Sequence, residues 1–314
     1  MIRKNIVRLL LYIFIVSVIV SGVQVSAATA VPSSYDKWGT SALGPGFPST
    51  VANYYKITKL CETKKENKKF TFTVISNEVK TNLYVTFPSI GGFRIFSDDS
   101  GYYEPDGIQK IRYKTETDGS IRMSARDGTT VIFEKSGETF SLKVFNSEEK
   151  QLFRITSDQI AFGYSRGKLA KIKFEMPLSE KESIYGTGER FNELEQVGKR
   201  LLMWNVDCGY HGAANAEFWR GYKNIPLLYS NRGYTLFYNS FYSASIDIGY
   251  TDSNKYTMDF GGPEFDIYFW TGTPRDNLQA YTKLTGVTLL LPKWAYQYSA
   301  GAGSGVWGSS IYGK

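Results

Sequence analysis

The chain has 314 residues, of which 42% are hydrophobic and 16% aromatic, and its formal net charge is +7 at pH 7. One histidine and two cysteines exclude a multi-histidine metal site, a Cys/His zinc cluster and a disulfide framework within the chain. The basic run at residues 64–69 has no interleaved aromatic residues, so it predicts a solvated loop and no nucleic-acid partner.

Residues 1–27 have the pattern of an export signal. Arg3, Lys4 and Arg8 give a basic start, residues 9–20 are an apolar run, and residues 25–27 (Val-Ser-Ala) supply a small-residue cleavage site. The run of 12 residues is shorter than the roughly 20 needed to cross a bilayer. We expect a secreted, extracellular protein that leaves the membrane once the signal is cleaved; a retained membrane anchor is the alternative.

Short segments of alternating polarity follow and predict many antiparallel strands. Two-residue turn signals that contain glycine separate these segments, which is typical of a mostly β sandwich. The turns are Gly91-Gly92, Asp118-Gly119, Asp127-Gly128, Ser136-Gly137 and Arg232-Gly233. The apolar faces are Phe70, Phe72 and Val74; Leu83, Val85 and Phe87; Phe140, Leu142 and Val144; Ile172, Phe174 and Met176; Ile246 and Ile248; and Phe265, Ile267 and Phe269.

The segment Tyr185–Phe191 has a Gly-x-Gly turn followed by an acid and a base. A dinucleotide fingerprint needs a third glycine where Phe191 stands, and no βαβ pattern surrounds the segment, so nucleotide binding is excluded. We interpret the segment as a sharp turn at a strand end, with Glu189 and Arg190 forming a local ion pair.

Asn205 and Asp207 lie in the next loop among aromatic residues. Planar polar groups bond sugar hydroxyls, and aromatic rings stack on the apolar face of a pyranose, so this composition fits a sugar site. An Asx-turn in an ordinary loop, with aromatics that belong to the core, fits equally well on composition alone. The aromatic neighbours are Trp204, Tyr210, Phe218, Trp219 and Tyr222.

One helix is predicted near the end of the β-rich region. Thr273 is placed to cap it, Pro274 suits its first position, and Gly286 is placed to end it. Leu278, Tyr281 and Leu284 follow at helical spacing. After this helix, residues 294–299 are expected to form a single strand, and residues 300–314 are rich in Gly and Ser.

The order of these motifs resembles glycoside hydrolase family 31 over roughly residues 60–300. The resemblance implies a galactose-mutarotase-like antiparallel β-sandwich followed by a catalytic (β/α)8 barrel. It also implies action on α-linked glucose or xylose units, by retaining hydrolysis or by transglycosylation. The motifs are Tyr185–Phe191, Trp204–Asp207, Asn231–Tyr234, Leu284–Gly286 and Leu291–Trp294.

The resemblance assigns roles to two residues. Asp207 and Asn205 match the family's Asn-x-Asp loop, which reaches over the mouth of the barrel, and are therefore expected to bind an α-linked oligosaccharide substrate. The insertion at residues 209–220, which contains His211, departs from the commoner pattern. No cofactor is implied, because the chemistry needs only two carboxyl groups.

Neither of those carboxyl groups is expected in this chain, since it has no Trp-x-Asp-Met-Asn-Glu type segment and a complete barrel takes about 250 residues. We expect a signal peptide (1–27), an N-terminal linker (28–54), the sandwich (55–291) and the start of a truncated barrel (292–314). The remaining barrel would be lost or separately encoded. The alternative is a non-catalytic secreted carbohydrate-binding sandwich. Glucose or xylose preference, and pairing of Cys61 with Cys208, stay open.

Overall fold

A computed structural model describes residues 53–97, 107–165, 168–190, 192–205 and 223–296. The strands are β1 Tyr54–Lys56, β2 Lys59–Lys65, β3 Phe70–Ser76, β4 Val79–Thr86, β5 Phe93–Ser97, β6 Arg112–Thr115, β7 Ile121–Ser124, β8 Thr130–Ser136, β9 Thr139–Phe145, β10 Gln151–Thr156, β11 Ile160–Ser165, β12 Lys168–Pro177, β13 Ile184–Glu189, β14 Lys199–Met203, β15 Lys223–Ser230, β16 Tyr234–Tyr238, β17 Ala244–Ile248, β18 Lys255–Phe260 and β19 Asp266–Thr271. The helices are the short 3-10 segments η2 Ser157–Gln159 and η3 Lys293–Tyr296, and the α-helix α3 Pro274–Thr285.

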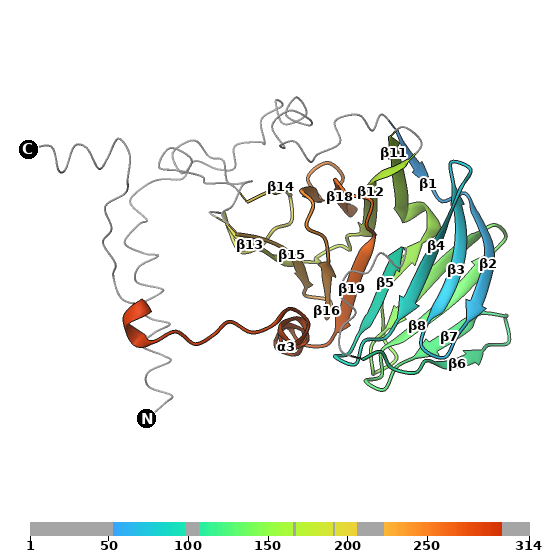
Figure 1. The fold of residues 1–314 in the computed structure, drawn as a ribbon, viewed down its shortest axis with the longest axis horizontal. Helices are drawn as coiled ribbons and strands as arrows, with labels where there is room; N and C mark the ends of the chain where they lie inside the picture. The colour runs from blue at the N-terminus through green and yellow to red at the C-terminus, as the bar shows by residue number, and fades with distance from the viewer. Residues whose placement is uncertain (1–52, 98–106, 166–167, 191, 206–222, 297–314) are drawn as a thin grey trace, which may run out of the picture.

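The strands form three antiparallel sheets arranged as a sandwich (Figure 1). An eight-stranded sheet has the order β13-β15-β16-β19-β5-β4-β3-β2. The six-stranded sheet β1-β11-β12-β18-β17-β14 and the five-stranded sheet β10-β9-β8-β7-β6 contribute to the same buried core as the large sheet. The predicted antiparallel β-sandwich is confirmed.

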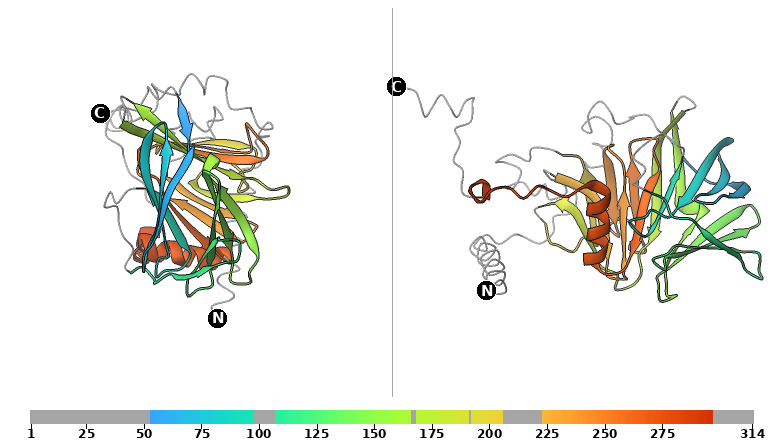
Figure 2. Two further views of the ribbon diagram at one scale, coloured as in Figure 1. Left: turned by 90° about the vertical axis from the view of Figure 1, so that its right-hand side faces the viewer. Right: turned by 60° about the horizontal axis from the view of Figure 1, so that its bottom comes forward.

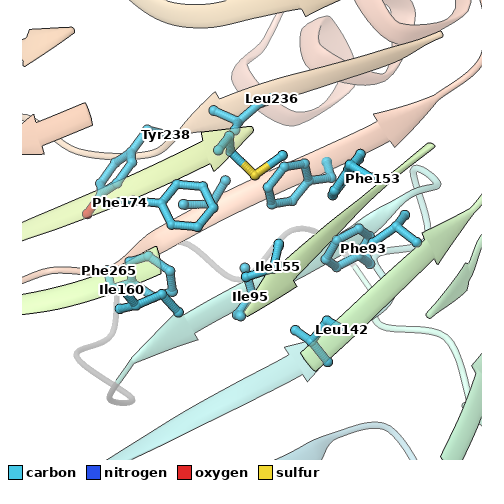
Figure 3. Packing of buried hydrophobic residues seen from close by; sticks show 14 of the residues in the cluster. Phe93, Ile95, Leu142, Phe153, Ile155, Ile160, Phe174, Leu236, Tyr238 and Phe265 are labelled. Carbon is cyan, nitrogen blue, oxygen red and sulfur yellow. The ribbon is translucent and has the colours of Figure 1, made fainter. Parts of the chain in front are cut away.

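The core between the sheets is aromatic and continuous (Figure 3). Every residue of the predicted apolar faces is buried in it. Aromatic pairs join the large sheet to both of the others: Phe72 lies 4.8 Å from Phe140 of the five-stranded sheet, and Phe269 lies 6.5 Å from Phe174 of the six-stranded sheet, measured between ring centroids. Period-two alternation therefore identified the inward face of each of these strands.

The outer face of the large sheet is covered at one end by α3 (Figure 2). Thr273 Oγ1 accepts a hydrogen bond from the Asp276 amide, and Asn277 Nδ2 donates to Thr235 Oγ1 on β16 at 2.9 Å. The predicted helix is confirmed. The buried face of α3 is offset from the predicted face, so Leu278 is 47% exposed. The cluster beneath α3 is Leu227, Phe237, Tyr268, Trp270, Ala280 and Leu284.

A buried ion pair joins β5 to β19. Arg94 Nε and Nη2 donate to the two carboxylate oxygens of Asp266 at 2.6 and 2.9 Å. Asn239 Nδ2 donates to the same carboxylate at 2.8 Å, so both Arg94 and Asn239 hydrogen-bond to the buried Asp266 side chain. Burial raises the pKa of the Asp266 carboxyl, and the Arg94 guanidinium opposes that rise.

The expected strand after the helix is wrong for the residues that the structure describes. Residues 293–296 form η3, with a turn hydrogen bond from the Ala295 amide to the Pro292 carbonyl at 2.9 Å. Trp294 and Tyr296 are 72% and 63% exposed. A strand needs neighbours to satisfy its backbone groups, and the described residues place none beside this segment.

Several predictions fall outside the described residues, namely the signal segment 1–27, Asp207, Cys208 and His211. Cys61 lies half-buried on β2. Among the described helices, none is both long and apolar enough to cross a bilayer.

Candidate functional site

The Gly-Thr-Gly segment on β13 is a β-bulge against β15. The register shifts between Gly186 and Gly188, whose φ angles are +111° and +94°. A Cβ atom would lie 2.2 Å from the Leu227 carbonyl oxygen at Gly186 and 2.1 Å from that of Lys223 at Gly188. Only glycine fits both the backbone conformation and the close approach. The predicted sharp turn is thus a bulge within β13, and the pairing with β15 resumes at Gly188 and Glu189.

Thr187, between the two glycines, is held in an unusual conformation. Its φ is +72°, which costs a β-branched residue on the order of 1–3 kcal/mol, and its side chain is buried. Thr187 Oγ1 donates to the Gly186 carbonyl at 2.6 Å and accepts from Arg190 Nε at 3.0 Å. The strained residue therefore serves to orient the guanidinium of Arg190.

Both charged side chains of this motif have partners on β15. Glu189 forms an exposed ion pair with Lys223, with 3.6 Å between Oε2 and Nζ. Arg190 Nη2 donates to Asn224 Oδ1 at 2.7 Å and to the Leu202 carbonyl at 3.3 Å. These contacts link the end of β13 to β14 and β15. The sequence had predicted only a local ion pair between Glu189 and Arg190.

Asn224 in turn fixes the orientation of the Asn205 side chain. Its backbone amide and its Nδ2 donate to Asn205 Oδ1 at 2.7 and 2.8 Å. Because Arg190 can only donate, Asn224 must direct its oxygen toward Arg190 and its amide nitrogen toward Asn205. Asn205 then directs its oxygen toward Asn224, so its own NH2 group is on the opposite branch. Asn205 is exposed, and that NH2 makes no hydrogen bond within the described residues.

Asn205 also lines a pocket of about 290 Å³. The pocket lies where β14 and β18 end, where β15 begins, and where residues 239–243 connect β16 to β17. The other lining residues are Met203, Trp204, Asn224, Pro226, Ser240, Phe241, Tyr242, Ser243 and Phe260.

Sequence reasoning placed Asn205 in a site but missed Asn224, Phe241 and Tyr242. Asn224 lies 19 positions from Asn205, and only the tertiary structure brings β15 next to the segment that follows β14. A signal for the other two was available, since Phe241 and Tyr242 are consecutive aromatics between serines in a strand connection. Asp207, the other predicted substrate-binding residue, lies outside the described residues. Those residues contain no cluster of His, Cys, Asp and Glu that could hold a metal ion.

Comparison with known proteins identifies the family. Residues 56–247 match the model of the glycosyl hydrolase 31 N-terminal galactose mutarotase-like domain. The chain belongs to glycoside hydrolase family 31. This family 31 chain is 24% identical over 237 residues to alpha-glucosidase 2 of Bacillus thermoamyloliquefaciens, covering 73% of the chain and 29% of that protein. It is 32% identical over 154 residues to alpha-xylosidase XylQ of Lactiplantibacillus pentosus, covering 49% of the chain and 18% of that protein.

Solved structures agree on the fold. The cycloalternan-forming enzyme from Listeria monocytogenes, solved in complex with a pentasaccharide substrate, superposes with a TM-score of 0.66 at 18% identity. The superposition covers 77% of the family 31 chain and 23% of that enzyme. The chain thus spans less than a third of the length of each of these relatives.

Proposed function

We propose that this chain is the amino-terminal β-sandwich of a secreted family 31 α-glycosidase acting on α-linked glucose or xylose units. The observation that carries the proposal is the family match over residues 56–247, together with relatives named as alpha-glucosidase and alpha-xylosidase. The hydrogen-bonded path from Arg190 through Asn224 to Asn205 supports it, because it links the family's two ordered motifs into one unit.

In this proposal the chain binds substrate and a barrel supplies the chemistry. Retaining cleavage of an α-glycoside needs a carboxylate nucleophile and a carboxylic acid about 5 Å apart. Both would come from a catalytic barrel, encoded further along or on a second polypeptide. Asn205 and Asp207 would bond sugar hydroxyls at the mouth of that barrel. The same covalent intermediate serves hydrolysis with water and transglycosylation with a sugar acceptor.

The first test is the activity of residues 28–314 alone. We expect no turnover of aryl α-glucosides or α-xylosides, because the two carboxyl groups belong to the barrel. Turnover that survives Asp207→Ala would show that the catalytic groups lie in this chain and that the assignment of roles is wrong.

The second test examines Asp207 with the catalytic barrel supplied in trans or by fusion. Asp207→Ala removes a charge-assisted hydrogen bond to a hydroxyl, worth on the order of 1.5–3 kcal/mol, so kcat/KM should fall roughly tenfold to a hundredfold. Asp207→Asn should lose less, since an amide still bonds a hydroxyl. A fall in melting temperature with unchanged kcat/KM would show that Asp207 is a structural turn residue.

Export is tested by following the protein in its host. The basic start, the apolar run and the small-residue site within residues 1–27 support cleavage after Ala27. We expect protein in the culture medium whose first residue is Ala28. Protein retained in the membrane fraction with residues 1–27 intact would favour an anchor.

A second candidate function is a non-catalytic carbohydrate-binding module, favoured by a pocket that this chain builds without other domains. The DNA downstream of the coding segment decides between the two. A continuation that encodes the two catalytic carboxylates favours the enzyme, and an intergenic region without one favours the module.

A further inference from the structure

We infer that a basic rim at one end of the sandwich binds a flexible linear polymer that carries phosphate groups. The rim consists of residues 64–69, which end β2 and lead into β3, and residues 110–116, which include β6. The inference goes beyond the proposed function and depends on it only for export, which would place the polymer outside the cell.

The rim holds the excess positive charge of the exported chain. Its seven cations and two carboxylates give a formal charge of +5. Without Arg3, Lys4 and Arg8 of the signal segment, the chain's formal charge of +7 falls to +4, so the rest of the exported chain is close to neutral. Six of the cations are exposed and Lys69 is half-buried. The cations are Lys64, Lys65, Lys68, Lys69, Lys110, Arg112 and Lys114.

The fold brings the two segments of the rim together. β2 is an edge of the eight-stranded sheet, and β6 is an edge of the five-stranded sheet. The Ile111 amide donates to the Asn67 carbonyl at 2.9 Å, and Lys65 Nζ donates to Thr115 Oγ1 at 3.0 Å. β13 forms the opposite edge of the eight-stranded sheet from β2, so the rim is distinct from the pocket beside Asn205 (Figure 1).

Tyr113 fixes the turn between β2 and β3 against β6. Its hydroxyl donates to the Glu66 carbonyl at 2.9 Å and to the Lys69 carbonyl at 3.1 Å. Its ring packs against Phe70, with 6.4 Å between the centroids. The backbone positions of the cations are therefore set before a ligand binds, which lowers the entropy cost of binding.

Protection of the sheet edges explains only part of this charge. Charged side chains on an edge strand, lysines above all, prevent it from pairing with another chain, and four of the seven cations lie on β2 or β6. The other three lie outside those strands, where no hydrogen-bond ladder needs protection: Lys68, Lys69 and Lys110.

The side chains of the rim favour a phosphate polymer without bases. Six of its seven cations are lysines, whose ammonium groups bind phosphate as point charges. Single-stranded nucleic acids bind by stacking their bases on aromatic faces. Here lysines already lie over those faces: Lys65 Nζ is 5.9 Å from the ring centroid of Tyr113, and Lys69 Nζ is 4.6 Å from that of Tyr84.

The test is a titration of residues 28–314 with long-chain inorganic polyphosphate at several salt concentrations. We expect binding at low ionic strength that weakens steeply with salt, because the polymer releases condensed counterions when it binds. Lys68→Glu combined with Lys110→Glu reverses two exposed charges of the rim. This variant should bind at least about tenfold more weakly, and the slope of log K against log salt should fall by about 2.

The matched control is Lys150→Glu combined with Lys181→Glu. It changes the net charge by the same amount at two exposed lysines outside the rim, so it should keep the affinity and the salt slope of the wild type. Lys68→Gln combined with Lys110→Gln removes the two rim charges without reversing them. It should lose less affinity than the reversal, and it serves as the test if the reversed variant does not fold.

The proposal is overturned if the wild-type chain does not bind polyphosphate, or if the rim variants bind it as tightly as the control. A single-stranded DNA oligonucleotide that matches the polyphosphate in charge but binds more tightly would also overturn it, in favour of a nucleic acid. Because neither a sugar nor a catalytic barrel enters this assay, its failure leaves the proposed glycosidase function standing. Polyphosphate binding by a chain whose assembled enzyme cleaves no α-glycoside would sink only the proposed function.

Discussion

The side chain of Asn224 donates to Asn205 Oδ1 at 2.8 Å while its own oxygen accepts from Arg190 at 2.7 Å. One amide therefore connects Arg190, which follows the bulged strand β13, to Asn205, which lies shortly after the end of β14. The relationship explains how a Gly-rich turn with no direct chemistry contributes to a site: the bulge sets the position of Arg190, and Arg190 sets the orientation of two amides.

Two substitutions at Asn224 separate these contacts. Asn224→Asp keeps the acceptor for Arg190 but replaces the side-chain donor to Asn205 with an acceptor, so the unfolding free energy should fall by less than in a variant that loses both contacts. Asn224→Ala also leaves Arg190 without this acceptor and should cost about 1–3 kcal/mol in urea unfolding. Equal losses in the two variants would show that the hydrogen bond from Arg190 contributes nothing to stability.

Gly188→Ala should disrupt the bulge. An alanine there has an unfavourable φ of +94° and a Cβ atom 2.1 Å from the Lys223 carbonyl oxygen. Gly119→Ala is the matched control, since Gly119 has a φ of +82° and open space around it. The control should lose about 1 kcal/mol from backbone conformation alone, and Gly188→Ala should lose at least about 2 kcal/mol more in urea unfolding. Equal losses would mean that β13 can shift away from β15 without penalty.

Arg94→Met should leave the buried Asp266 carboxylate without its cation. Breaking a buried pair in this way costs about 3–5 kcal/mol at neutral pH. Removing Arg94 removes the influence that lowers the pKa of Asp266, so the carboxyl of the variant takes up a proton more readily in the folded state. The deficit in unfolding free energy should therefore shrink as pH falls. A deficit that does not change with pH would show that lost packing, and not the charge, is responsible.

Glu134 provides a pH test on the five-stranded sheet. Partial burial disfavours its charge, but hydrogen bonds from Lys143 at 2.5 Å and Ser141 at 2.9 Å prevail and lower the pKa of Glu134 below its ordinary value of 4.5. A lowered folded-state pKa stabilises the fold above pH 4.5, and that contribution is lost as pH falls through the lowered value. Glu134→Gln should therefore lose less unfolding free energy than wild type between about pH 6 and about pH 3. Parallel curves for the two proteins would contradict this.

Local patterns in the sequence predicted the strands and the helix. Alternation such as Phe70, Phe72 and Val74 identifies a buried face because successive side chains on a strand point to opposite sides of the sheet. The cap Thr273 and the first-position Pro274 marked the start of α3 because capping depends on residues within one turn. Residues 294–296 were mispredicted as strand for the converse reason: a strand depends on neighbours that lie elsewhere in the chain.

The sequence by itself determined the family, the antiparallel sandwich and the presence of Asn205 in a loop with sugar-binding composition, since order, alternation and turn chemistry are all local. Only the tertiary structure decided that Arg190 orients Asn224 and that Asn205 shares a pocket with Phe241 and Tyr242. Asn224 lies on β15 and the others lie in the connections that follow β13, β14 and β16, so their proximity follows from how the strands are arranged in the sheets. A contact between residues far apart in sequence is set by sheet register, and register is a property of the whole assembled core.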